Sequence, residues 1–154
     1  MSGLFELSNP HIQRLNASQH LLTRQIEKTV SELLSVSVAT GVIGKKFTSD
    51  GPLGDGWPIE ITSKSEIVNF RFSNFVSYAV TSETYAQNHS DEECEGGWIR
   101  VYSKSFFLDF VAWSTWASSD YPGKLVHYQV NTLDHTIDVV TSQPPELNIS
   151  KGSV

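Results

Sequence analysis

The feature that most constrains the fold is a stretch of period-two alternation near the C-terminus. Apolar or β-branched residues alternate with polar ones over residues 125–131 and 136–141, and the tip Thr132-Leu-Asp-His separates the two runs. This pattern predicts a β-hairpin, because successive side chains of a strand point to opposite faces. A symmetric tip gathers apolar side chains on one face through three pairs, Tyr128 with Val139, Val130 with Ile137 and Val126 with Thr141.

The opposite face of this hairpin then carries five polar side chains, His127, Gln129, Asn131, Thr136 and Asp138. Asp138 lies diagonal to His127, at about 6–8 Å between Cβ atoms, a separation that the side chains can close to a hydrogen bond. Such a pair can orient an imidazole for acid–base catalysis or hold it as a metal ligand. A solvated sheet face is the simpler interpretation, because spacing fixes no nucleophile and no third catalytic partner.

Upstream of the hairpin, apolar spacing predicts two main helices. One runs over about residues 18–39 after a plausible cap at Asn16 or Ser18, and the other over about residues 104–118 after Ser103 or Ser105. Alternation over residues 68–80, with a bend or a turn at Ser73, predicts further strands. We expect an α+β fold, a mostly antiparallel sheet of about five or six strands with the two helices packed on it.

The length of 154 residues fits one domain, residues 1–154. Residues 1–15 show no clear period and are expected to form an arm. Residues 143–154 begin with Gln143-Pro-Pro, which cannot continue a central strand, and are expected to form a flexible tail.

Composition narrows the class of function. The net charge of −6 opposes binding to a nucleic acid backbone, and the longest basic cluster is the pair Lys45-Lys46. No apolar run is long enough to cross a bilayer and no signal peptide begins the chain, so we expect a cytoplasmic protein that does not enter a membrane. Cys94 is the single cysteine, which excludes an intrachain disulfide.

A polar segment over residues 84–97 concentrates carboxylates at Asp91, Glu92, Glu93 and Glu95. Its spacing matches neither a calcium loop nor a zinc site, so no metal or cofactor is predicted. We expect an exposed loop that steers a basic protein partner.

Aromatic residues near turns are the other candidate anchors for a partner. Trp57 lies in the glycine-rich stretch 51–58, and Tyr121 lies before a Pro-Gly pair. We expect both to be exposed and Trp116 to lie in the core.

Three segments resemble a stretch of small uncharacterised bacterial proteins, some of which are toxin-immunity partners. They are Arg100-Val-Tyr-Ser-Lys-Ser-Phe-Phe-Leu-Asp-Phe-Val, Tyr121-Pro-Gly-Lys-Leu-Val-His-Tyr-Gln-Val and Asp134-His-Thr-Ile-Asp-Val-Val. The resemblance covers the C-terminal third to half of the chain and carries over no functional residue.

The sequence therefore leaves two alternative functions. The first is a non-catalytic protein-binding domain, such as an immunity-type inhibitor of a basic toxin or enzyme, with the acidic segment as its contact. The second is a small enzyme or ligand-binding domain that uses His127, Gln129 and Asp138. It requires their face to lie in a pocket, so burial discriminates between the two.

Overall fold

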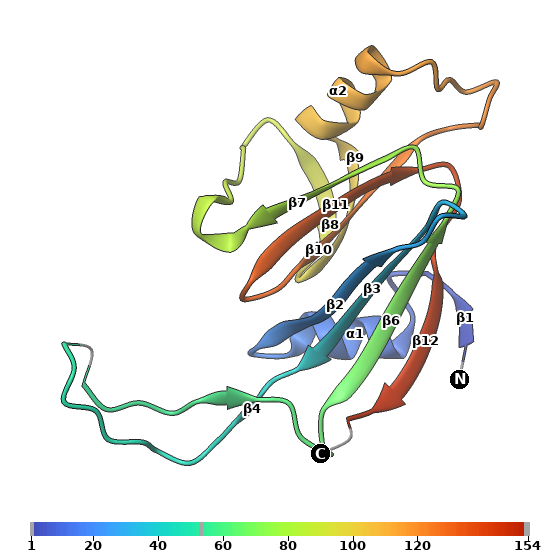
Figure 1. The fold of residues 1–154 in the computed structure, drawn as a ribbon. Helices are drawn as coiled ribbons and strands as arrows, with labels where there is room; N and C mark the ends of the chain where they lie inside the picture. Colours follow the sequence, from blue (N-terminus) through green and yellow to red (C-terminus); the bar gives the residue numbers. More distant parts are fainter. Residues whose placement is uncertain (1, 53, 153–154) are drawn as a thin grey trace.

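The structure is a computed structural model that describes residues 2–52 and 54–152. Within them the chain forms two five-stranded antiparallel sheets, a two-stranded ribbon, two α-helices and one 3₁₀ turn (Figure 1). The α+β class is confirmed. The single sheet of five or six strands is wrong, because the strands divide between two sheets.

Each sheet mixes strands from distant parts of the sequence. In spatial order the first sheet contains β1 (Ser2–Leu4), β12 (Glu146–Lys151), β6 (Glu66–Ser73), β3 (Leu33–Thr40) and β2 (Leu21–Lys28). The second contains β7 (Ser77–Ser82), β11 (His135–Thr141), β10 (Val126–Asn131), β9 (Ile99–Lys104) and β8 (Glu93–Gly96). The ribbon pairs β4 (Val42–Ile43) with β5 (Ile59–Glu60).

The core lies between the two large sheets. One cluster of buried apolar residues includes Phe70 and Phe72 of β6 together with Ile137 of β11 and Tyr128 of β10. The rings of Phe72 and Tyr128 approach across the layers, with 6.0 Å between their centroids. The faces of both sheets that point away from this core are thereby left for solvent or for a site.

The predicted helix over residues 18–39 is wrong. The segment forms the hairpin of β2 and β3, with Glu32 at φ 59° in the turn between them. Val36 and Val38 are β-branched and fully buried against β6, so period-two burial prevails over the helical spacing of the leucines. Val30, which falls on the apolar face if residues 18–39 are drawn as a helix, is fully exposed in the turn.

The expected N-terminal arm is also wrong, apart from residue 1, which lies outside the described residues. The segment holds β1 and the helix α1 (Pro10–Ala17), which begins where the side chain of Asn9 accepts a hydrogen bond from the amide of His11. Ile12 and Leu15 are fully buried in the core. An amphipathic helix that short shows too few apolar positions for its period to be read from sequence.

The expected flexible tail is a strand. Residues 146–151 form β12, which pairs with β1 on one side and β6 on the other, and Leu147 is 1% exposed. Residues 153–154 lie outside the described part. The prolines at 144 and 145 end one strand but leave the next free to begin.

The second helix is confirmed in kind and is shorter than predicted. It is α2 (Phe106–Ser114), and of the two candidate caps Ser105 holds it, accepting a hydrogen bond from the amide of Leu108. The bend at residue 73 carries the chain from β6 in the first sheet to β7 in the second, so those two strands do not pair. In Figure 1, α2 lies at the top of the view, beyond the second sheet.

Candidate functional site

The predicted hairpin register is confirmed and creates the site. β10 and β11 pair Tyr128 with Val139 and Val130 with Ile137, so the polar side chains share the face away from the core. On that face Nε2 of His127 lies 2.7 Å from Oδ1 of Asp138. His127 is only 2% exposed, so the interpretation of this face as solvated is wrong at its centre.

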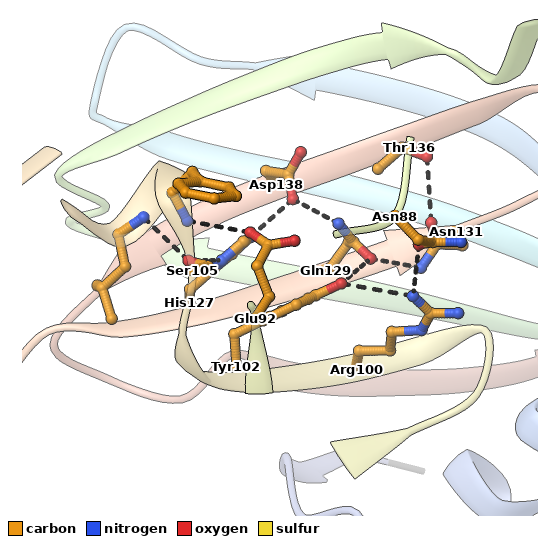
Figure 2. Close-up of polar contacts among 12 residues, drawn as sticks. Asn88, Glu92, Arg100, Tyr102, Ser105, His127, Gln129, Asn131, Thr136 and Asp138 are labelled. Atoms are coloured by element: carbon orange, nitrogen blue, oxygen red, sulfur yellow. Dashed lines mark hydrogen bonds and ion pairs between the residues drawn. The ribbon is translucent and has the colours of Figure 1, made fainter. Parts of the chain in front are cut away.

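A third residue completes a buried chain of hydrogen bonds (Figure 2). Oγ of Ser105 lies 2.7 Å from Nδ1 of His127, and Ser105 is 1% exposed. This oxygen also accepts the Leu108 amide. Because a carboxylate oxygen can only accept, Nε2 of His127 donates to Asp138.

This chain of hydrogen bonds contains the residue types of a hydrolytic triad but not an accessible nucleophile. Catalysis of that kind requires a solvent-accessible serine whose proton passes to the imidazole at the moment of attack. Ser105 is buried and caps α2, so its hydroxyl is closed to a substrate. The arrangement fixes the position of the Asp138 carboxylate.

Aromatic packing on both sides fixes the imidazole further. The ring of Tyr102 stacks on His127 with 4.6 Å between centroids and 16° between planes, and the ring of Phe107 meets it edge-on at 5.4 Å. A side chain held by two hydrogen bonds and two rings has little rotational freedom left, so the group is preorganised.

A second set of hydrogen bonds orients the amide of Gln129. Its Oε1 accepts from Tyr102 at 3.1 Å and from Asn131 at 2.8 Å, so its nitrogen must face Asp138, where it donates to Oδ1 at 2.8 Å. Burial raises the pKa of Tyr102 above its ordinary value, although nearby Arg100 works the other way. The phenol therefore keeps the proton that it donates.

Both donors to Asp138 end on the same oxygen, Oδ1 (Figure 2). Its other oxygen, Oδ2, has no hydrogen-bond partner within residues 2–52 and 54–152. No side-chain nitrogen or oxygen in this part of the chain is both buried and without a partner, so Oδ2 is reached by solvent.

Asp138 lines a concave site, the His127 pocket, of about 630 Å³. Its floor is the polar face of the second sheet, with His127, Gln129 and Asp138, and its walls come from residues 83–89, Glu92 and the start of α2. A volume of this size suits a small organic molecule.

Arg100 is the arginine that lines this pocket, and it is committed to holding the wall. Its guanidinium donates to the carbonyl of Gly97 at 2.7 Å, to Asn88 at 3.2 Å and to the hydroxyl of Tyr102 at 3.4 Å. The bond to Asn88 joins the polar segment 84–92 to β9. Arg100 thereby shapes the pocket.

The acidic segment is not one uniform loop. Glu93 and Glu95 lie exposed on β8, the edge strand of the second sheet, and Asp91 is exposed before it. Glu92 is half-buried, lines the His127 pocket and accepts a hydrogen bond from the amide of Phe106 at 3.0 Å. The four carboxylates therefore divide between an open edge and a pocket wall.

The aromatic candidates lie on separate parts of the molecule. Trp57 and Tyr121 are exposed as expected, at 60% and 81%. Tyr121 follows α2, whereas the segments of residues 44–52 and 54–58, drawn from cyan to green, extend from the far end (Figure 1). The prediction that Trp116 lies in the core is wrong. Trp116 is fully exposed, because α2 ends at Ser114 and does not carry this side chain inward.

Sequence reasoning missed several parts of the site. Ser105 was expected as a helix cap, and the position of a cap next to the hairpin is a tertiary contact that spacing does not encode. Glu83, Arg100 and Tyr102 carried no motif. The alternation of β9 after the glycines at 96 and 97 did place Arg100 and Tyr102 on one face, and this was the available signal.

Comparison with known proteins gives no relative from which to transfer a function. Neither a protein-family model, nor a curated protein, nor a solved structure matches the chain. Among the described residues, no helix is long and apolar enough to span a membrane. In the same part of the chain, no group of three or more His, Cys, Asp or Glu side chains is placed to hold a metal ion.

Proposed function

We propose that the chain binds a small polar molecule in the His127 pocket and holds it without covalent chemistry. The observation that carries the proposal is the Asp138 carboxylate, which lines the pocket and is held through Oδ1 by His127 and Gln129, while its Oδ2 is reached by solvent. Buried polar networks cost stability unless fully satisfied, so a network built around one open acceptor is typical of a binding site.

The remaining groups of the network support binding over catalysis. Ser105 is too buried to attack a bound molecule, so His127 has no accessible nucleophile to activate. Gln129 and Asn131 hold each other in one orientation. Rigid polar groups around a concave space reduce the entropy lost when a ligand is fixed, which favours affinity.

A fragment screen tests this function. We expect polar fragments to shift the NMR resonances of the Gln129 side-chain amide and of the Asp138 amide. The variant Ala86→Trp places a large side chain on the pocket wall, where Ala86 is exposed and contributes no side-chain hydrogen bond, and it should abolish these shifts. Gln13→Trp, on the exposed side of α1, is the matched control and should leave them intact.

The outcomes are separable. Shifts that disappear in Ala86→Trp and persist in Gln13→Trp support the pocket as the site. If the screen moves no resonance of β10 or β11, or if the shifts survive in Ala86→Trp, the proposed function is wrong.

A second candidate function is protein binding, in which the chain acts as an immunity-type inhibitor of a basic toxin or enzyme. It is supported by the exposed carboxylates of β8 and by aromatic side chains that stand in solvent on and after α2. Trp113 is 83% exposed, and Trp116 and Tyr121 are similarly open. Tryptophan and tyrosine are frequent anchors of protein interfaces, and carboxylates at a rim accelerate association with a basic partner.

This candidate has its own test. The triple change Asp91→Asn, Glu93→Gln and Glu95→Gln leaves Glu92, and so the start of α2, untouched. With a purified basic partner at low salt, we expect slower association and little change in dissociation. Unchanged association would remove the acidic edge from the interface.

A further inference from the structure

The polar groups on the pocket floor are unbalanced between donors and acceptors. Every side-chain donor group of β10 and β11 that lines the pocket already has an acceptor: His127 and Gln129 donate to Asp138, Thr136 donates to Asn131, and Asn131 donates to Gln129 and to the carbonyl of Trp98. The floor still offers Oδ2 of Asp138, which accepts and cannot donate, and the second N–H of the Gln129 amide. The open carboxylate oxygen favours a ligand that supplies donors.

The charged residues around the pocket also favour a ligand that donates hydrogen bonds, and in particular a cation. Glu83 and Glu92 line the pocket with Asp138, against one guanidinium, that of Arg100. Three hydrogen bonds from its Nε and Nη1 hold this guanidinium to the protein. The chain as a whole carries a net charge of −6. An anionic ligand would meet uncompensated carboxylates, whereas a cation would relieve their mutual repulsion.

Aromatic rings complete the lining. Tyr85 and Phe106 stand at the pocket, 80% and 52% exposed, and Phe107 lies beside His127. The face of an aromatic ring attracts a cation and also accommodates the apolar part of an organic molecule. Carboxylates combined with exposed rings therefore suit an organic cation better than an inorganic one.

We propose that the His127 pocket takes an organic ammonium ion whose N–H groups donate to Oδ2 of Asp138 while its hydrocarbon part lies against the rings of Tyr85, Phe106 and Phe107. This inference rests on the proposed function, because it names the class of molecule that the same pocket binds. An ammonium group has three donors and no acceptor, which matches the open Oδ2 of Asp138.

Two matched sets of probes test the class. Benzylamine, benzyl alcohol and benzoate share one ring and differ in charge, and 1,5-diaminopentane and 1,5-pentanediol share one chain. Each is titrated into the ¹⁵N-labelled protein near neutral pH, and the amide shifts of Gln129 and Asp138 are followed. We expect at least one amine to bind saturably, about tenfold more tightly than its alcohol, the difference made by one hydrogen bond to a charged group.

Asp138→Asn is the discriminating variant. Asparagine keeps an oxygen that accepts from His127 and Gln129, so the network survives, but it replaces Oδ2 with an NH₂ donor. We expect it to weaken amine binding at least about tenfold. Asp50→Asn removes an equal charge from an exposed position outside the pocket and should leave the affinity within about twofold.

The failures are distinguishable. If benzyl alcohol or benzoate binds as tightly as benzylamine, or if Asp138→Asn binds the amine like the wild type, the ammonium class is wrong while the pocket remains a binding site. If neither amine shifts Gln129 or Asp138, the class is also wrong. The fragment screen with Ala86→Trp then decides whether the pocket binds anything at all.

Discussion

Two carboxylates of this molecule are buried to a similar degree and differ in what their oxygens do. The side chain of Glu66 on β6 is 9% exposed, and that of Asp138 on β11 is 15% exposed. Both oxygens of Glu66 accept hydrogen bonds, Oε2 from Arg14 at 2.9 Å and Oε1 from Arg14 at 3.0 Å and from His11. Asp138 receives both of its donors on Oδ1.

The difference separates a structural carboxylate from a binding one. Glu66 joins α1 to the first sheet, and its satisfied oxygens leave nothing for a ligand. Burial opposes ionisation of Glu66, but the hydrogen bonds from Arg14 and His11 outweigh it and hold its pKa below the usual value. Oδ1 of Asp138 accepts two hydrogen bonds, whereas its Oδ2 is open to solvent. Fractional burial alone does not reveal this distinction.

The largest expected effect compares the two histidines that hold these carboxylates. His127→Ala removes a fully buried ring, two hydrogen bonds and the stacking on Tyr102, and should lower the free energy of unfolding by about 3 kcal/mol. His11→Ala should cost about 1 kcal/mol, because His11 is 21% exposed and Arg14 still holds Glu66. Denaturant unfolding measures both, and equal losses would contradict the difference between the two sites.

Loss of charge should destabilise the protein much more at Glu66 than at Asp138. Glu66→Gln replaces an acceptor oxygen with a donor that faces Arg14 and His11, and should cost about 2 kcal/mol of stability. Asp138→Asn preserves the acceptor that His127 and Gln129 use, so we expect a change under about 0.5 kcal/mol. If Asp138→Asn proves the more damaging of the two in thermal and denaturant unfolding, Oδ2 is not the open group that the structure indicates.

The smallest of these effects concerns pH. Because the pKa of Glu66 is lowered in the folded state, the unfolded chain binds a proton first as the pH falls. The stability from this group is complete above about pH 4.3, the ordinary value for glutamate, and is lost as the pH falls through the lower folded pKa. Glu66→Gln should flatten this part of the stability–pH curve. An unchanged slope would show that other acids govern it.

Much of the candidate site could be predicted from the sequence, because the hairpin that carries it is local. The turn and the alternation fix its register, and the register alone places His127 diagonal to Asp138. The decisive facts were not local. Whether that face is open depends on segment 83–92 and on α2, which approach it from elsewhere in the chain, and Ser105 reaches His127 across 22 residues.

The fold was harder to predict where local and tertiary preferences disagree. Leu22, Ile26 and Leu33 recur at helical spacing, yet strand pairing with β6 buries the alternate residues Leu34, Val36 and Val38. Pairing between strands far apart in sequence cannot be read from either period. For the same reason β12 could not be predicted, because the strands that pair with it, β1 and β6, lie far from it in the sequence.

The most direct test of the account is to watch both carboxylates while an amine is added. In protein labelled with ¹³C at side-chain carboxyl groups, benzylamine is titrated and the resonances of Asp138 Cγ and Glu66 Cδ are followed. We predict a saturable shift at Asp138 and none at Glu66, because one carboxylate has an open oxygen and the other does not. A shift at Glu66, or a resonance of Asp138 that does not move at saturating amine, would contradict the account.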